Sequence, residues 1–251
     1  FSPDATMKNP NIIRQSELMY ISGNPDLKCS RNTSANISYT WLPSNKWQLS
    51  AYATMFLISN RQIAVYTPDG PDGMMLKKYQ NDGDYNHGQI GANLTGKFID
   101  GRLSISVSPR MLLYKTTGSN SISYYPFSAS LNVNYYLGRF FFNGYYDTGS
   151  SYVDGENAFL RKMPMSYSVS AGWSSRGWNI QLSVVNPFQS SWKLSEDTLT
   201  TRWYDNKMTQ FGSDYHRRIS LTVTYTFNYG KKVSQTGELS GEKNISTSIL
   251  K

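Results

Sequence analysis

The residues with the clearest chemical potential in this chain of 251 residues are its two histidines, His87 and His216. Each stands between a long polar segment and a segment in which apolar and polar residues alternate. A hydrolytic site would pair such a histidine with a serine or aspartate within hydrogen-bonding distance. The spacing of the sequence assigns no such partner to either histidine. We therefore expect both to lie at the rim of a sheet, with no catalytic residue and no enzymatic activity.

Two aspartate-rich stretches, PDGPDG at 68–73 and NDGDYN at 81–86, could offer oxygen ligands to a calcium ion. Neither has the spacing of a full calcium loop, and Asp-Gly and Asn-Asp pairs are also typical of tight turns. The single cysteine, Cys29, excludes an internal disulfide, and no Cys/His spacing typical of a metal site is present. We expect turns at both stretches, no bound metal and no cofactor.

The long polar segments also carry aromatic residues among Asp, Asn and Lys. Such a mixture can stack on sugars or hold a peptide, because aromatic side chains offer a large apolar face and, in Tyr and Trp, a polar edge. The alternative is that these rings pack against one another between loops. The candidate ligand-contacting residues are Tyr66, Tyr79, Tyr85, Trp192, Trp203 and Tyr204.

The elements that must position these residues are strands, because an alternation with a period of two recurs along the chain. In ISLTVTYTFNY, residues 219–229, every second residue is apolar or aromatic and the others are Ser, Thr or Asn. Many of the stretches approach ten residues, whereas globular strands more often have about five or six and a tilted strand crossing a bilayer needs about nine to eleven. About nine such stretches lie near 31–42, 47–57, 90–98, 103–107, 127–135, 140–146, 167–173, 178–184 and 219–229.

The connections between these stretches alternate between short and long. Tight turns are expected at 43–46, 99–102, 137–139 and 174–177, and long polar loops at about 60–87, 116–124, 148–164 and 189–214. Outer-membrane barrels are built in this way, with short turns at one end and long loops at the other. A soluble sandwich has no reason to sort its loops so strictly. The pattern predicts an all-β fold: part of an antiparallel, up-and-down transmembrane β-barrel with about nine long strands.

Aromatic residues recur on the apolar face just inside each tight turn. Aromatic rings of this kind favour the headgroup level of a membrane and form a girdle there, although for a single hairpin they could equally plug the end of a soluble core. The opposite face carries Ser, Thr, Asn and Gln, which suit a barrel lumen. The expected girdle in contact with outer-membrane lipid consists of Trp41, Trp47, Phe98, Tyr135, Phe140, Trp173, Trp178 and Phe227.

The charges are scattered, and the ends of the chain are unusual for a complete protein. The net charge is +8, but Lys and Arg form no stripe of the kind that binds nucleic acid. The chain opens with FSPDATMKNP, without an initiator Met or a leader. Nine strands are an odd number, whereas bacterial single-chain barrels have even counts. We expect residues 1–230 to be a C-terminal barrel segment preceded by at least one more strand, and 231–251 to be a flexible periplasmic tail.

Three sequence elements resemble a known family. The element GNPDLKCSRNTSANISYTW at 23–41 resembles the "GNP-x-L-x-P-E" element near the C-terminal part of TonB-dependent receptors, especially those of Bacteroidetes, although Cys29 and Ser30 stand where Pro-Glu is common. The ending RRISLTVTYTFNYGKK at 217–232 resembles the last strand of the Bacteroidetes outer-membrane β-barrel family. VVNPF at 184–188 is similar to a short Asn-containing element that follows the penultimate strand in that family.

The resemblance implies a long barrel with an N-terminal plug, and TonB-energised uptake of a small nutrient ligand such as an oligosaccharide, a peptide or a metal chelate. It implies the outer membrane of a Gram-negative bacterium, with long loops outside and the C-terminus in the periplasm. The last strand would present the signal that the barrel assembly machinery reads, and the TonB complex would act through parts upstream of this segment. Two alternatives stay open: a non-transport barrel, such as an adhesin or an outer-membrane enzyme, and a soluble β-sandwich that binds carbohydrate.

Overall fold

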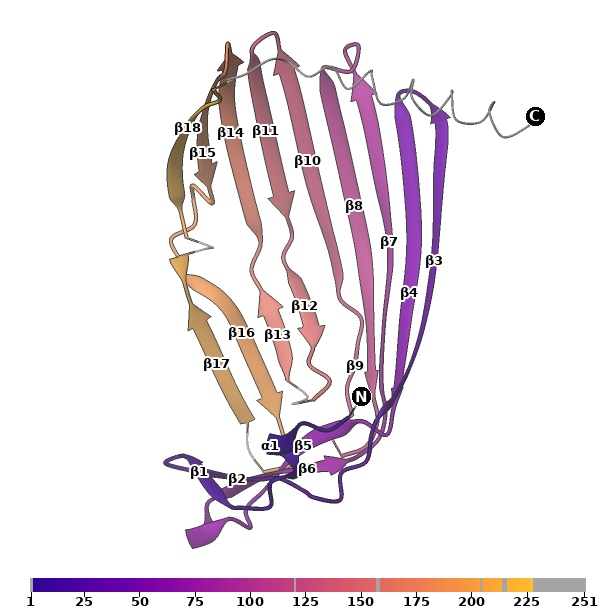
Figure 1. The fold of residues 1–251 in the computed structure, drawn as a ribbon, viewed down its shortest axis with the longest axis vertical. Helices are drawn as coiled ribbons and strands as arrows, with labels where there is room; N and C mark the ends of the chain where they lie inside the picture. The colour runs from indigo at the N-terminus through magenta and orange to yellow at the C-terminus, as the bar shows by residue number, and fades with distance from the viewer. Residues whose placement is uncertain (1, 120, 157–158, 204, 214–215, 228–251) are drawn as a thin grey trace, which may run out of the picture.

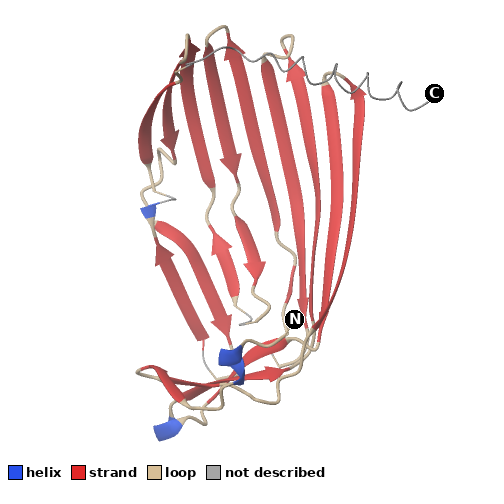
Figure 2. Cartoon of the chain, viewed as in Figure 1, coloured by secondary structure: helices blue, strands red, loops and turns tan. Residues whose placement is uncertain are grey.

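The protein forms a tall wall of strands with two smaller sheets at one end (Figure 1; Figure 2). The structure is a computed structural model that describes residues 2–119, 121–156, 159–203, 205–213 and 216–227. The expected tail at 231–251 lies outside these residues. Within the described part of the chain, no helix is both long enough and apolar enough to cross a membrane.

The wall is one antiparallel sheet in which nine strands follow in the order β18-β15-β14-β11-β10-β8-β7-β4-β3. A short strand, β9 (Ser123–Tyr124), pairs with β8 beside this path. The bounds are β3 (Arg31–Ser44), β4 (Trp47–Ser59), β7 (Tyr85–Phe98), β8 (Leu103–Thr116), β10 (Phe127–Leu137), β11 (Phe140–Asp147), β14 (Ser166–Ser175), β15 (Trp178–Val185) and β18 (Arg218–Tyr225). The expected up-and-down arrangement is confirmed, and the sheet stays open between β3 and β18.

The four expected tight turns all lie at one end of this wall (Figure 1). Gly138 and Gly177 adopt φ of 60° and 87°, which glycine accepts without steric cost. Ile99 also has a positive φ, 54°, which is unusual for a β-branched residue. The last strand ends earlier than the alternation suggested, at Tyr225 rather than 229.

The two faces of the wall differ as the alternation predicts. Large apolar side chains stand exposed on one face, including Ile37 at 71% and Ile219 at 74% of their full exposure. The other face is polar and hydrogen-bonded within itself. Thr95 and Ser106 bond through their hydroxyls at 2.8 Å, and Asn93 Nδ2 donates to Ser108 Oγ at 2.7 Å. Because no second sheet covers the apolar face in the described residues, the sandwich alternative does not fit.

All four expected long loops contain strands, which corrects the sequence-based expectation. Residues 60–87 supply β5 (Gln62–Thr67) and β6 (Met75–Asn81), and the first thirty residues supply β1 (Ile13–Ser16) and β2 (Met19–Ser22). These four strands form the cap sheet, in the order β1-β2-β6-β5, with β2 and β6 parallel. The cap sheet also carries the short helix α1 (Ala5–Lys8) and the 3-10 turn η1 (Pro71–Gly73). The sequence did not predict these short strands, because the Pro, Asp and Gly residues beside them are typical of turns and loops.

A second set of loop strands forms the rim sheet, in the order β12-β13-β16-β17. Its strands are β12 (Ser150–Val153), β13 (Leu160–Met163), β16 (Lys193–Thr200) and β17 (Asp205–Phe211). Figure 1 shows the rim sheet continuing the wall beyond β11 and β14, and the cap sheet crossing the same end of the molecule. This capped end is called the mouth below.

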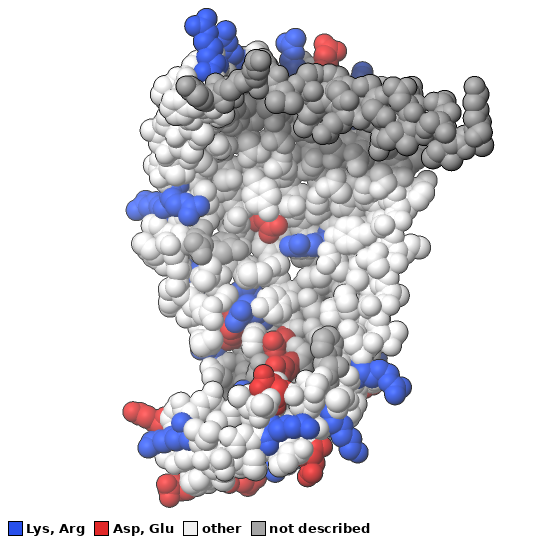
Figure 3. Space-filling model, viewed as in Figure 1, with Lys and Arg blue, Asp and Glu red and all other residues white. Residues whose placement is uncertain are grey.

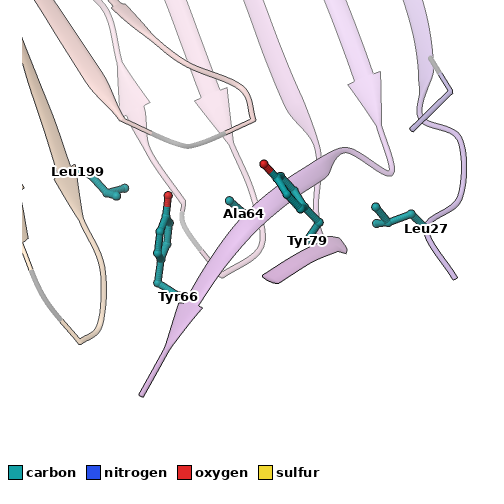
Figure 4. Close-up of a cluster of buried hydrophobic side chains, with 5 residues drawn as sticks. All are labelled: Leu27, Ala64, Tyr66, Tyr79 and Leu199. Carbon is teal, nitrogen blue, oxygen red and sulfur yellow. The ribbon is translucent and has the colours of Figure 1, made fainter. Parts of the chain in front are cut away.

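The buried hydrophobic cluster of the described residues lies in the mouth. It consists of Leu27, Ala64, Tyr66, Tyr79 and Leu199 (Figure 4). Ala64 and Tyr66 come from β5, Tyr79 from β6 and Leu199 from β16, so burial joins the cap sheet to the rim sheet. Apolar burial is the main favourable term in folding, and here it fixes the loops across the end of the wall.

Two glycines in the wall, Gly172 on the inner face and Gly144 on the outer face, test the packing inside the wall. A Cβ on Gly172 would lie 2.1 Å from Phe141 Cζ and 2.9 Å from the Ile180 carbonyl oxygen, whereas one on Gly144 would meet nothing within 4 Å. We expect Gly172→Ala to lower the free energy of unfolding by about 1–3 kcal/mol through overpacking. Gly144→Ala should change it by less than about 0.5 kcal/mol.

The measurement is urea unfolding of the natural full-length protein in detergent, followed by tryptophan fluorescence. Equal unfolding free energies for the two variants would contradict the close packing of Phe141 on Gly172.

Candidate ligand-binding mouth

Five of the six candidate ligand contacts lie in the described residues, and they differ in accessibility. Tyr66 and Tyr79 are each only 8% exposed. Figure 4 shows both rings rising from the same side of the cap sheet, within the buried cluster. A ligand could reach them only after the cap sheet moved. For these two residues, packing between loops describes the observed arrangement.

The other candidates are closer to solvent. Tyr85 is partly buried, and its hydroxyl donates to the Val153 carbonyl at 2.8 Å. Trp192 and Trp203 are 51% and 53% exposed. Trp192 stacks on His216 with ring centroids 4.0 Å apart, and the guanidinium of Arg202 lies over the Trp203 ring. Tyr204 lies outside the described residues. Trp192 and Trp203 lie at opposite ends of β16, so they form two separate exposed aromatic positions.

The cap sheet is joined to the wall through Arg61, a residue that the sequence did not single out. Arg61 is 2% exposed, and its guanidinium donates to the carbonyl oxygens of Asp82, Gly155 and Thr117 at 3.1, 3.4 and 3.0 Å. A planar fork of donors can satisfy several carbonyls at once, which lysine cannot do in the same geometry. Arg61 thereby joins the start of β5 to three other segments of the mouth.

The rim sheet contains a second cross-link that the sequence did not reveal. Arg161 on β13 makes a two-point contact with Asp197 on β16, with nitrogen–oxygen distances of 2.6 and 2.5 Å. Asp197 is only 6% exposed, and Arg161 also donates to the Tyr152 hydroxyl at 3.1 Å. Lys193 and Lys207 both pair with Glu196. Partners separated by more than thirty positions give no local signal in the sequence.

The two aspartates of the NDGDYN stretch accept hydrogen bonds from backbone amides of the mouth. Asp82 accepts a hydrogen bond from the Ser119 amide at 2.6 Å, and Asp84 accepts one from the Asn60 amide at 3.2 Å. Asp72 adopts φ 58° inside η1. In the residues that the structure describes, no group of three or more His, Cys, Asp or Glu side chains is arranged to hold a metal ion.

His87 lies near the mouth end of β7 and His216 lies two residues before β18, and both stack on aromatic rings. His87 lies parallel to Phe56 and Tyr85, with ring centroids 4.6 and 5.0 Å apart. The column continues to Tyr114, 6.5 Å from Tyr85. These rings line the inner face where the wall meets the mouth, which makes an aromatic wall surface below the cap sheet.

The eight aromatic residues predicted as a girdle lie beside the tight turns on the apolar face, at the opposite end from the mouth. Neighbouring rings touch across strands: Trp47 meets Phe98 edge to face at 5.5 Å, and Trp178 lies 4.6 Å from Tyr225. Phe140 is paired with Trp173 in the register of β11 and β14. The band thus runs along the wall, and its contact with lipid headgroups stays a prediction.

Charged groups gather over the cap sheet (Figure 3). Burial raises the pKa of Glu156, and Asp154 adds to this effect, while Lys77 and the Tyr79 hydroxyl partly oppose it. Burial also lowers the pKa of Lys77 despite the attraction of Glu156. In this pair, loss of hydration therefore outweighs mutual attraction. Asp82 behaves oppositely: burial acts to raise its pKa, but hydrogen bonds from Ser119 and the charge of Arg61 lower the pKa overall.

The raised pKa of Glu156 predicts that the mouth loosens as pH rises. A carboxyl with a raised folded-state pKa contributes stability that is complete below its unfolded value and is lost as pH rises through the folded value. The Ala64 amide, which donates to the Glu156 carbonyl at 3.0 Å, reports on this contact. We expect its corrected hydrogen-exchange protection to be greater at about pH 5 than at about pH 8.

Glu156→Gln should remove most of that pH difference in protection, because the glutamine side chain does not titrate. An equally large difference in the variant would assign the effect to another group. The lowered pKa of Asp82 acts only at more acidic pH and does not interfere.

Comparison with known proteins places this geometry in a family. A model of the outer membrane protein beta-barrel family matches residues 3–229, and no curated protein matches the sequence. The solved structure of the FrpB iron transporter from Neisseria meningitidis (F3-3 variant) is similar over 83% of this chain, with a TM-score of 0.53 and 16% identity. This chain spans 33% of that structure, and the likeness concerns the fold. On the family match and the strand wall together, the chain belongs to the outer membrane protein beta-barrel family and is an outer-membrane protein.

Proposed function

We propose that the chain forms barrel wall and ligand-entry mouth of a TonB-dependent receptor-like transporter for a small nutrient ligand. The observation that carries the proposal is the combination of a capped mouth with a polar inner face beneath it. Ser, Thr, Asn and Gln line that face and offer exchangeable hydrogen bonds to a passing polar ligand. The structural neighbour is named an iron transporter, which is consistent with uptake of a metal chelate as well as of an oligosaccharide or a peptide.

In this proposal the tight turns face the periplasm and the mouth faces the cell exterior, as is usual in outer-membrane barrels. The apolar face contacts outer-membrane lipid, and the aromatic band lies at the periplasmic headgroup level. The last strand is presented to the barrel assembly machinery. Energy would come from the TonB complex, acting through a plug domain.

A non-transport role, such as that of an adhesin or an enzyme, remains the alternative. An adhesin would use only the exposed aromatic residues of the mouth and would need no polar path below the cap sheet. Uptake by whole cells separates the two, because only a transporter moves ligand to the periplasm.

The exposed tryptophans of the mouth provide a test of uptake. We expect Trp203→Ala to reduce energised uptake by about tenfold, since losing one stacking contact of about 1–1.5 kcal/mol changes affinity by roughly that factor. Trp203→Phe keeps an aromatic face and should retain most of the uptake. The assay compares labelled oligosaccharide, peptide and ferric chelate in cells that carry each variant. Unchanged uptake in Trp203→Ala and Trp192→Ala would remove the tryptophans from the ligand site.

Two adjacent residues of β15 test membrane insertion. Leu182 lies on the apolar face about four residues from the aromatic band, which is near the middle of an apolar belt about 25 Å tall. Leu182→Arg should destabilise the assembled barrel by about 2–4 kcal/mol, whereas Ser183→Arg on the inner face should be tolerated. The fraction of folded protein in outer-membrane preparations measures the difference. Equal assembly of both variants would contradict lipid contact at Leu182.

A further inference from the structure

A hollow of about 220 Å³ opens in the inner face where the wall passes into the rim sheet. Here β11 ends at Asp147 and β12 begins at Ser150, while the neighbouring β13 ends at Met163 and β14 begins at Ser166. The hollow is lined by side chains from β8, β11 and the strands beyond this step, among them Arg110, Tyr145, Asp147, Ser150 and Ser166.

The backbone around the hollow is closely fitted. Gly149 adopts φ 85°, and a Cβ there would lie 2.5 Å from the Met163 carbonyl oxygen. Only glycine suits both the conformation and the space. Pro164 has no amide hydrogen, so it cannot continue the strand ladder at this point. Gly149 and Pro164 therefore account for the break between the wall and the rim sheet.

The hollow contains opposite charges on an inner face that is otherwise nearly neutral. The alternation places four charged residues on the inner face of the described wall strands: Lys97, Arg110, Asp147 and Arg218. Only Arg110 and Asp147 line the same hollow. In the described part of the chain, neither of these two takes part in a salt bridge. Two unpaired, opposite charges in one hollow can hold a ligand that carries both signs.

Each charged group is oriented by a neighbour. Arg110 Nε donates to Ser128 Oγ at 2.8 Å, and Ser128 is buried, so this bond directs the guanidinium and leaves its two terminal nitrogens for a ligand. Asp147 Oδ1 accepts from the Gly149 amide at 2.7 Å, and the Tyr145 hydroxyl donates to Oδ2 at 3.4 Å. A carboxylate has about four lone-pair sites, so Asp147 can accept further bonds.

The register gives the separation of the two groups. Asp147 is opposite Ser130, and Ser130 is opposite Ser108, two residues along β8 from Arg110. Their Cα atoms are thus about 10 Å apart across the strands and about 7 Å along them. The long Arg110 side chain shortens this gap. An α-amino acid head group with one charged hydrogen bond at each end spans roughly 8–9 Å, which is shorter than this separation of the Cα atoms.

We propose that this hollow binds the α-amino acid head group of a ligand, with its carboxylate on Arg110 and its ammonium on Asp147. The inference rests on the proposed uptake function and specifies the ligand class as an amino acid or a molecule that ends in one. The head group occupies the part of the hollow between the two charges, and the remainder of the ligand extends into the lumen. Tyr145, Ser150 and Ser166 add hydroxyls around it.

The test uses three probes on the natural full-length protein in detergent: L-alanine, N-acetyl-L-alanine and L-alaninamide. Calorimetric titration should show L-alanine binding at least about tenfold more tightly than either blocked form, because each block removes one charge-assisted hydrogen bond. Equal affinities for the three probes, or no binding of L-alanine, would overturn the proposal.

Two variants assign the two ends of the ligand. Asp147→Asn retains an oxygen for the Gly149 amide, and it should weaken L-alanine by about tenfold while leaving N-acetyl-L-alanine unchanged. Arg110→Gln should weaken L-alanine similarly and leave L-alaninamide unchanged. Equal loss for all probes in both variants would indicate a distorted wall and contradict the assigned contacts.

Whole-cell uptake separates this inference from the proposed function. If L-alanine does not bind but cells still take up labelled oligosaccharide or ferric chelate with TonB energy, the head-group site is wrong and transport stands. If the titrations give the expected pattern while no energised uptake of any probe is found, the site stands and the transport role is wrong.

Discussion

The structure depends on the hydrogen-bonding of the peptide groups in its wall. A bilayer supplies no water to bond exposed N–H and C=O groups, so strands can cross it only when each is paired with a neighbour. The nine strands from β3 to β18 meet this requirement through one continuous antiparallel ladder. Its two outer strands each have one unpaired edge in the described chain, and in a membrane such edges require partner strands. The apolar side chains on the outward face follow from the same pairing, because alternate residues of a paired strand must point outward.

The mouth is stabilised differently from the wall. Its segments lie outside the ladder, where water can satisfy the backbone, so their order comes from burial and from cross-links. The cluster around Tyr66 and Tyr79 joins the cap sheet to the rim sheet, and Arg61 satisfies three carbonyl groups from separate segments. Glu156 and Lys77 are both partly dehydrated in this region. Buried charge whose hydration is not fully replaced lowers stability, so this pair opposes part of the stabilisation that the buried cluster gives the cap.

The two regions together suggest how a ligand would travel. In the proposed function, exposed Trp203 would offer a first surface, and the aromatic column from Phe56 to Tyr114 lies where the mouth meets the inner wall. Beyond that column the face is lined by hydroxyls and amides, and the Arg110–Asp147 hollow interrupts it with charge. Weak, repeated polar contacts favour passage, because a ligand held too tightly at one position would not leave it.

The sequence by itself determined the wall: the period-two alternation in segments such as 127–135 and 219–229, and the glycine turns at Gly138 and Gly177, are local signals that predict strands, faces and tight turns. It also placed the aromatic band, since seven of the eight rings stand within two residues of a tight turn. Tertiary structure alone decided the mouth, where segments expected to be polar loops pair as the cap and rim sheets. Contacts such as Arg61 with Gly155, or Arg161 with Asp197, join residues far apart in the chain. These contacts form only when the loop segments pack together over the wall. A local pattern of residues therefore does not predict them.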